Sequence, residues 1–202
     1  DKLISFCDRH DYTYKFEDNQ YYGTPFEVNE GISYDGVKDY MRSICSHPPR
    51  KYQVEGVYDA LKHNRKLLIS PTASGKSLMI YSLVRYYVGK SQKILLVVPT
   101  TSLVEQMYKD FEDYGFDVGS FCHKIYGGKE LNTNKQVTIT TWQSIYKLPK
   151  TFFQKYSVVI GDEAHNFKSK SLINIMTKLC DAKYRCLLST FFIKRTQPNL
   201  SQ

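Results

Sequence analysis

Apolar and polar residues follow two alternating periods along most of the chain. From residue 50 onward, amphipathic segments with the helical period alternate with short runs that are apolar at nearly every position. The expected helices cover residues 52–63, 75–88, 102–114 and 170–179, and the expected strands cover residues 66–70, 93–99, 136–141, 157–162 and 184–189. Strands that are apolar on both faces and alternate with helices are typical of a parallel sheet covered on both sides. The pattern predicts a doubly wound α/β domain, whose ligands bind beyond the carboxyl ends of the strands.

Residues 1–47 lack this regular alternation. They are rich in Tyr, Asp and Asn, with one short helix expected over residues 36–45 and otherwise small strands and turns. His-Pro-Pro at residues 47–49 separates this segment from the rest, because proline disfavours helix at its own position and at the residue before it. We expect residues 1–47 to be the remainder of an accessory domain, as a small packed β unit rather than a nucleic-acid surface. Residues 48–190 then form the α/β domain, and the start at Asp1 without methionine favours a fragment.

Composition narrows the class of protein. The 202 residues are 42% hydrophobic, which suffices for one full core and a small appendage. The longest apolar run, residues 94–98, is far shorter than the ~20 residues of a membrane span, and no signal peptide is recognisable. Five cysteines without a C-x-x-C pair favour reduced thiols over a disulfide or zinc framework. We therefore expect a soluble cytoplasmic protein.

The net charge of +8 permits a polyanionic partner, since clustered Lys and Arg release counterions from phosphates. The basic residues are spread along the sequence, however, so a solvated basic surface is an equally good interpretation of charge alone.

The stretch SPTASGKS at residues 70–77 joins an expected strand to an expected helix. This order suits a phosphate-binding loop, because loop and helix N–H groups face the anion and Gly75 allows close approach. In such a loop Lys76 reaches the β and γ phosphates, and Ser77 places its hydroxyl on Mg²⁺. The usual opening glycine is replaced by Ser70, and an ordinary turn with a helix N-cap is the simpler alternative.

A second motif, SVVIGDEAH, ends an apolar strand with Asp162 and Glu163. A carboxylate at the tip of a strand beside a P-loop can hold Mg²⁺, and the next one can polarise the attacking water in phosphoryl transfer. A helix N-cap followed by a solvated acid is the commoner explanation of Asp-Glu alone. In combination the two motifs favour an ATP site.

These motifs resemble those of the superfamily 2 helicases and translocases, in which motif I reads [AP]-T-x-x-G-K-[ST] and motif II reads DEAH or a relative. The resemblance accounts for the missing glycine. Within the superfamily, the segments FCDRHDYTYK, PRKYQ, VVPTTSLVEQM and TTWQSIYKLPK are most similar to the UvsW-like helicases of T-even phages, and the similarity extends to about residue 189. It implies a RecA-like P-loop NTPase domain.

The resemblance implies roles for individual residues. Gln53 would read the adenine edge with Arg50 close to the nucleotide, although an exposed helical glutamine is the alternative. The phosphate loop would comprise Pro71, Thr72, Ala73, Ser74, Gly75, Lys76 and Ser77. The catalytic set would be Lys76, Asp162 and Glu163, with Mg²⁺ held by Ser77 and Asp162. His165 would couple the nucleotide site to the motif III strand. A zinc role for His165 has no partner at ligand spacing.

Further motifs imply contacts with a nucleic-acid backbone. The expected contact residues are Pro99, Thr100, Thr101, Gly127, Gly128 and Thr141. Contacts of this kind fix register without reading sequence, so the substrate preference would be for nucleic-acid form. Trp142 is the candidate for stacking on a base, although a core position is the commoner role of a lone tryptophan.

The expected function is that of an ATP-dependent DNA helicase or translocase, N-terminal part, acting on branched or recombination and replication intermediates. ATP and Mg²⁺ are the expected cofactors and DNA the partner, with RNA left open, in the cytoplasm of an infected bacterium if a phage encodes the protein. The alternatives are the translocating subunit of a restriction enzyme and a nucleotide-gated nucleic-acid-binding module without productive hydrolysis.

Two departures from the superfamily limit what the 202 residues are expected to do. The second RecA-like domain, which carries the motif VI arginines, is absent, so the chain alone should bind ATP and hydrolyse it poorly. Ser189 and Thr190 are the only possible remnants of motif III, and the tail at residues 191–202 has no counterpart that we identify. We expect the reading frame or gene fragment to end artificially near residue 190.

Overall fold

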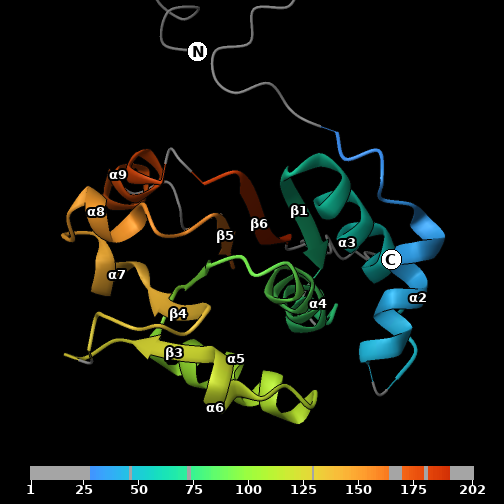
Figure 1. Cartoon of the computed structure of the whole chain (residues 1–202), viewed down its shortest axis with the longest axis horizontal. Helices are drawn as coiled ribbons and strands as arrows, with labels where there is room; N and C mark the ends of the chain where they lie inside the picture. Colours follow the sequence, from blue (N-terminus) through green and yellow to red (C-terminus); the bar gives the residue numbers. More distant parts are fainter. Residues whose placement is uncertain are drawn as a thin grey trace, which may run out of the picture.

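A parallel sheet organises the part of the chain that the structure describes. The computed structural model describes residues 28–45, 47–71, 74–128, 130–163, 170–179 and 182–191. Within these ranges the strands are β1 (Arg65–Pro71), β2 (Ile94–Val98), β3 (Cys122–Ile125), β4 (Val137–Thr141), β5 (Val158–Gly161) and β6 (Tyr184–Phe191). Their order across the sheet is β1-β6-β5-β2-β4-β3, and every neighbouring pair is parallel (Figure 1). The predicted parallel α/β fold is confirmed.

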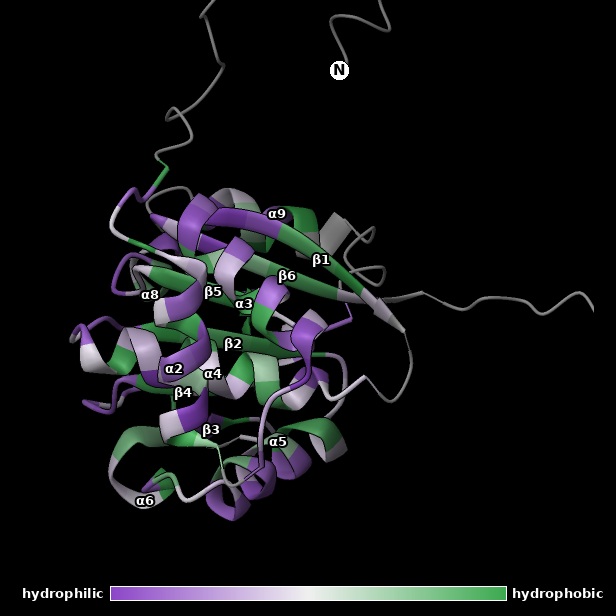
Figure 2. Ribbon diagram, turned by 90° about the vertical axis from the view of Figure 1, so that its right-hand side faces the viewer, coloured by the Kyte–Doolittle hydropathy of each residue, from purple (hydrophilic) through white to green (hydrophobic). Residues whose placement is uncertain are grey.

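Helices connect the strands and cover both faces of the sheet. The described helices are α2 (Tyr34–Ile44), α3 (Lys51–His63), α4 (Lys76–Gly89), α5 (Thr101–Asp113), α6 (Val118–Phe121), α7 (Trp142–Ile145), α8 (Lys150–Phe153) and α9 (Lys170–Lys178). One core lies between the sheet and α2 to α6, and a second lies between the sheet and α7 to α9. Figure 2 shows the apolar strands enclosed by helices that carry polar residues.

Strand β2 is apolar at every position because both of its faces are buried. All five of its residues are buried. Leu96 and its alternate neighbours belong to the first core, whereas Leu95 and Val97 belong to the second, because successive side chains of a strand point to opposite faces. Burying both faces of the central strands contributes roughly 1.5–3 kcal/mol per large apolar side chain, and this burial stabilises the carboxyl edge that carries the predicted site.

Helix α2 packs against α3 and contributes to the first core. Val37 and Met41 are buried in that core, and the Tyr40 hydroxyl donates a hydrogen bond to the carbonyl of Ser82 over 2.8 Å. The expected helix at residues 36–45 is therefore present, and its packing partner is the α/β domain. Residues 1–27 lie outside the described residues, so the domain boundary near residue 48 stays a prediction.

Three short helices and one strand were not expected from the periodicity. Helices α6, α7 and α8 each have four residues, and so does β3, whose sequence CHKI has two polar residues in its middle. Segments of this length have no full period to recognise. None of the described helices is long and apolar enough to cross a membrane.

Candidate nucleotide and nucleic-acid site

The two predicted ATP motifs lie at the same edge of the sheet. All strands are parallel, so their carboxyl ends meet at one edge, where ligands of such sheets bind. The loop that leads to α4 follows β1, and Asp162 follows β5. Only β6 separates these two strands in the sheet, which brings motifs that are far apart in sequence close together.

Gly75 forms the turn from the phosphate loop into α4. It is the N-cap residue of the helix and has a left-handed backbone with φ of 73°. A side chain would be strained in that conformation, and a Cβ atom there would also clash with Nε2 of Gln53. Glycine is therefore required twice at this position, by the backbone angle and by the close approach of a neighbouring amide.

The side chain of Gln53 is buried and hydrogen-bonds to the backbone of the phosphate loop. It is only 5% exposed, and Nε2 donates to the carbonyls of Ser74 over 3.0 Å and Gly75 over 3.4 Å. Its Oε1 accepts from the backbone N–H of Arg50 over 2.9 Å, which closes the first turn of α3. The alternative of an exposed helical glutamine is wrong. Reading of the adenine edge stays a prediction, since both polar atoms of the amide already contact the backbone.

Tyr52 and Arg50 extend this support. The Tyr52 hydroxyl donates to the Ser74 carbonyl over 2.8 Å, and Nη1 of Arg50 donates to the Tyr52 hydroxyl over 3.0 Å. Arg50 thus lies one side chain away from the phosphate loop. Pro71 ends β1, whereas Thr72 and Ala73 lie outside the described residues.

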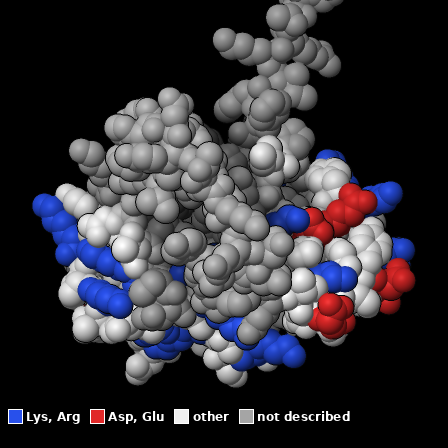
Figure 3. Space-filling model, turned by 90° about the horizontal axis from the view of Figure 1, so that it is seen from above, with Lys and Arg blue, Asp and Glu red and all other residues white. Residues whose placement is uncertain are grey.

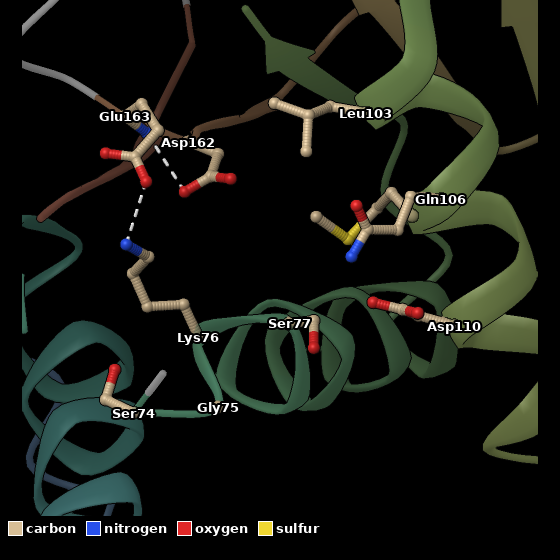
Figure 4. Close-up of a pocket in the computed structure, with 10 residues that line it drawn as sticks. Ser74, Gly75, Lys76, Ser77, Leu103, Gln106, Asp110, Asp162 and Glu163 are labelled. Carbon is tan, nitrogen blue, oxygen red and sulfur yellow. Dashed lines mark hydrogen bonds and ion pairs between the residues drawn. The ribbon is translucent and has the colours of Figure 1, made fainter. Parts of the chain in front are cut away.

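Lys76 and Glu163 form an ion pair across the site. Nζ of Lys76 lies 2.8 Å from Oε1 of Glu163, with side-chain exposures of 14% and 22% (Figure 4). Glu163 has a left-handed backbone with φ of 52°, and its N–H donates to Oδ1 of Asp162 over 2.9 Å. Asp162 is itself buried. The lysine of motif I and both carboxylates of motif II therefore form one cluster, as the sequence predicted.

A pocket of about 280 Å³ lies between this cluster and α5. Its lining comes from α4, α5 and the end of β5, and comprises Ser74, Gly75, Lys76, Ser77, Leu103, Gln106, Met107, Asp110, Asp162 and Glu163 (Figure 4). The pocket is open to solvent on one side. The α5 residues were missed from the sequence, although their spacing at 103, 106, 107 and 110 places them on one helical face.

Ser77 has a hydrogen-bond partner at the end of α5. Its hydroxyl lies 3.0 Å from the hydroxyl of Tyr114, and Asp110 of α5 lines the same pocket. Burial raises the pKa of the Asp110 carboxyl.

The donor set fits a magnesium ion bound together with phosphates. The hydroxyl of Ser77 and the carboxylate of Asp162 line the same pocket, and Mg²⁺ prefers one or two such oxygen ligands plus phosphate and water. Among the described residues no group of three or more His, Cys, Asp and Glu side chains could hold a metal alone. A cation held by Ser77 and Asp162 would take its remaining ligands from phosphate and water.

The predicted nucleic-acid contacts lie farther along the same edge. Pro99 and Thr100 follow β2, Gly127 and Gly128 follow β3, and β2, β4 and β3 are neighbours in the sheet. Both glycines are exposed and have left-handed backbones. These segments form one continuous border.

Within this border, Thr100 and Thr101 form the start of α5. The Thr100 hydroxyl caps the helix by accepting from the N–H of Leu103 over 3.3 Å, and both threonines are exposed. Thr141 is 3% exposed, and its hydroxyl lies 2.9 Å from that of Ser144. A side-chain contact of Thr141 with a nucleic acid is therefore less direct than one of the α5 threonines, and all these roles stay predictions.

Trp142 packs against the second core. Its ring meets that of Tyr146 edge-on, with 6.1 Å between the ring centroids. This geometry favours the core alternative over base stacking. His165 lies outside the described residues, so its predicted coupling role is untested.

Charge is distributed unevenly over the face of the molecule that Figure 3 shows. In Figure 3 only Lys and Arg are seen at the left margin, the side of α7 and α8 in Figure 1, whereas Asp and Glu accompany them at the right, the side of α2. The basic residues on the first side include Lys147, Lys150 and Lys155.

The parallel sheet, the phosphate loop after β1 and the strand-terminal carboxylates across β6 define the N-terminal RecA-like domain of a superfamily 2 helicase. The chain belongs to the family described as type III restriction enzyme, res subunit, which matches residues 46–193.

Named relatives agree with this class. The chain is 36% identical over 146 residues to the ATP-dependent DNA helicase uvsW of Enterobacteria phage T4 and 32% identical over 137 residues to the DNA 3'-5' translocase XPB2 of Sulfurisphaera tokodaii. These matches cover 70% and 67% of this chain and 29% of each relative. The crystal structure of the UvsW helicase from bacteriophage T4 superposes with a TM-score of 0.76 at 30% identity, over 93% of this chain and 68% of that one. The predicted superfamily and the similarity to UvsW are confirmed.

Proposed function

We propose that this chain is the ATP-binding part of an ATP-dependent DNA helicase or translocase that acts on branched or recombination and replication intermediates. The observation that carries the proposal is the contact between Lys76 and Glu163 beside a pocket lined by Ser77 and Asp162. The relatives named above, described as a DNA helicase and a DNA translocase, support DNA as the substrate, and the branched form rests on the similarity to UvsW.

Each residue of the cluster has a role that follows from its position. Lys76 at the start of α4 faces the terminal phosphates, and the helix N-terminus adds its partial positive charge. Ser77 and Asp162 would hold Mg²⁺, which when bound neutralises charge on the phosphates. Glu163 would orient and deprotonate the attacking water.

The ion pair between Lys76 and Glu163 has a consequence for this mechanism. A carboxylate paired with an ammonium group is a weak base, because the cation stabilises its ionised form. Phosphate oxygens that bind Lys76 would compete with Glu163 for the same ammonium group. Nucleotide binding would therefore free the carboxylate to act on water in the same step that places the substrate.

The sharpest test is the equilibrium affinity of the 202-residue chain for Mg-ATP, measured by titration calorimetry. We expect binding in the parent and its loss in Lys76→Ala. Lys90→Ala, at the opposite end of α4, is the matched control and should bind like the parent. Absence of binding in the parent, or equal binding in both lysine variants, would refute the nucleotide site.

A second measurement separates an enzyme from a nucleotide-gated binding module. Glu163→Gln should keep Mg-ATP affinity and abolish DNA-stimulated hydrolysis, whereas a pure binder shows no hydrolysis to lose. We expect slow turnover by the chain itself, since a transition-state arginine supplied by a second RecA-like domain contributes ~10³–10⁵ in rate.

The family match also favours a second candidate, the translocating subunit of a restriction enzyme. Both candidates share the ATP site and movement along DNA. A nuclease domain encoded in the same gene would decide for the restriction subunit.

A further inference from the structure

The connection between β4 and β5 carries positive charge and no acidic residue. Residues 142–157 include Lys147, Lys150 and Lys155 but neither aspartate nor glutamate, and α9, which packs against α7, has no acidic residue either. By contrast, α2, α3 and α5 on the other face of the sheet each carry acidic residues. The side of α7 and α8, where only Lys and Arg are seen in Figure 3, is therefore built from acid-free segments.

This connection extends from one edge of the sheet to the other. It leaves the carboxyl edge after Thr141, the last residue of β4, and reaches the amino edge before Val158, the first residue of β5. Strand β2 lies between these two strands, and its five residues correspond to roughly 17 Å at the rise of a strand. The three lysines are thus distributed along a path that begins at the predicted nucleic-acid border.

The three ammonium groups are available to a partner. Lys147 and Lys150 are exposed, and within the part of the chain that the structure describes none of the three forms an ion pair with a carboxylate. Nζ of Lys155 lies 4.6 Å from the ring centroid of Phe152 and 5.2 Å from that of Tyr156. These rings hold the stem of the lysine without neutralising its charge.

The backbone that carries these lysines is held in place by α9. Nζ of Lys178 donates to the carbonyls of Tyr146 and Leu148 over 3.1 and 2.8 Å, in the turn between α7 and α8. Ile145 and Phe153 are buried in the second core on either side of this turn. The connection is therefore fixed to the domain at several points, and a partner would meet a preformed surface.

A path of unpaired cations suits the phosphates of a duplex. Double-stranded DNA carries one negative charge per about 1.7 Å of its axis, so a length of roughly 17 Å offers about ten phosphates. The rings next to Lys155 are either buried, as Tyr156 is, or lie beneath its ammonium group, as Phe152 does. Bases of a single strand would find no open ring there to stack on, whereas the backbone of a duplex needs only charge.

We propose that the surface formed by Lys147, Lys150 and Lys155, the α7–α8 lysine track, binds the phosphate backbone of a double-stranded arm of the DNA substrate. The proposal rests on the DNA helicase or translocase function proposed above and adds a duplex contact to it. The arm would leave the predicted contacts at the carboxyl edge and follow the second face of the sheet toward the amino edge.

The test measures the affinity of the full 202-residue chain for a blunt fluorescein-labelled duplex by fluorescence anisotropy, from about 50 to about 200 mM NaCl. The track variant combines Lys147→Gln, Lys150→Gln and Lys155→Gln. Its slope of log affinity against log salt should be smaller than that of the parent by about 2.7, or about 0.9 for each phosphate contact. The ratio of parent to variant affinity should accordingly fall about fortyfold over this range of salt.

A charge-matched control separates the track from net charge. The control variant combines Lys51→Gln, Lys90→Gln and Lys109→Gln, which remove the same charge from exposed positions on the other face of the sheet. It should keep the slope of the parent. Arginine at the three track positions should also keep the slope, because the guanidinium group retains the charge. The affinity of the track variant for a single strand of the same length should change little.

Several results would overturn the proposal. Equal slopes in the parent and the track variant would mean that the track makes no phosphate contact, and a loss of slope in the arginine variant would mean that the lysines act through packing. An equal loss of affinity for the single strand, or for phosphatidylserine vesicles, would mean that the track follows charge and does not select a duplex. A parent chain that binds neither form of DNA at low salt would refute the proposed function itself, before any variant is compared.

Discussion

Gln53→Glu is the perturbation for which the structure makes the most definite prediction. The change keeps the size and shape of a buried side chain. One carboxylate oxygen can still accept from the N–H of Arg50, while the other replaces Nε2 and faces the carbonyls of Ser74 and Gly75 at 3.0 and 3.4 Å. Two donated hydrogen bonds become two contacts between oxygen atoms.

The magnitude follows from these contacts. Loss of the bonds removes roughly 0.5–1.5 kcal/mol each, with the longer one at the low end, and a buried carboxylate facing acceptors adds about 1–3 kcal/mol. We expect the free energy of unfolding to fall by about 2–4 kcal/mol at neutral pH. With an m-value of about 2–3 kcal/mol/M, the urea midpoint should fall by about 0.7–2 M.

The loss should depend on pH with a definite sign. Burial among acceptors raises the folded-state pKa of the new carboxyl above its unfolded value of about 4.3, so the neutral form is favoured in the fold. The penalty is then absent below the unfolded pKa, grows as the pH rises through it and is complete above the folded pKa. A protonated carboxyl can donate again, so the difference from the parent should shrink between pH 7 and pH 5.

Urea unfolding followed by circular dichroism at both pH values checks this reasoning. Gln143→Glu is the control, because Gln143 is exposed and makes a single long hydrogen bond to the Pro99 carbonyl. It should change stability by no more than about 0.5 kcal/mol. An unchanged midpoint in Gln53→Glu, or a loss of equal size at pH 7 and pH 5, would refute the role of the amide as a donor to the loop.

Three further results are expected. Gly75→Ala should lower Tm more than Gly115→Ala does. Both glycines have left-handed backbones, but a new Cβ at Gly75 would clash with Gln53, whereas nothing lies within 4 Å of one at Gly115. Equal losses of Tm in the two variants would show that the clash with Gln53 has no effect. Trp142, the chain's only tryptophan, should shift its fluorescence to the red in urea and show no stacking quench with single-stranded DNA, since its ring packs on the second core. Burial raises the pKa of the Cys186 thiol to about 12, so iodoacetamide at pH 8 should label it only after unfolding, as mass spectrometry of peptides would show.

The order of long elements was predictable because each has a recognisable period. Strands apolar at every position, such as β2, alternate with helices long enough to show an amphipathic face, and the sheet they form is confirmed. The strand β3 was missed because His123 and Lys124 interrupt four residues that are held mainly by pairing with β4. The strand order across the sheet likewise depends on pairing, which no local pattern records.

Part of the candidate site was likewise predictable from the sequence, and part was not. The cluster of Lys76, Asp162 and Glu163 was predictable, because a loop and a strand end with fixed chemistry must meet at one edge of a parallel sheet. The contribution of α5 was not, since a face with Gln106 and Asp110 beside apolar residues reads as ordinary amphipathic helix. The contacts of Gln53 with the phosphate loop could not be predicted either, because they form only when α3 packs beside β1.

Helix α5 takes part in both halves of the carboxyl edge. Its first turn presents Thr100 and Thr101 among the predicted nucleic-acid contacts, and its inner face lines the nucleotide pocket down to Asp110. A helix of 13 residues with Val104 and Phe111 anchored in the core moves as one body, because its backbone hydrogen bonds resist bending within so few turns. The hydroxyl of Ser77 lies 3.0 Å from that of Tyr114, the C-cap residue of α5, so the phosphate loop is hydrogen-bonded to the end of the helix that begins among the predicted nucleic-acid contacts.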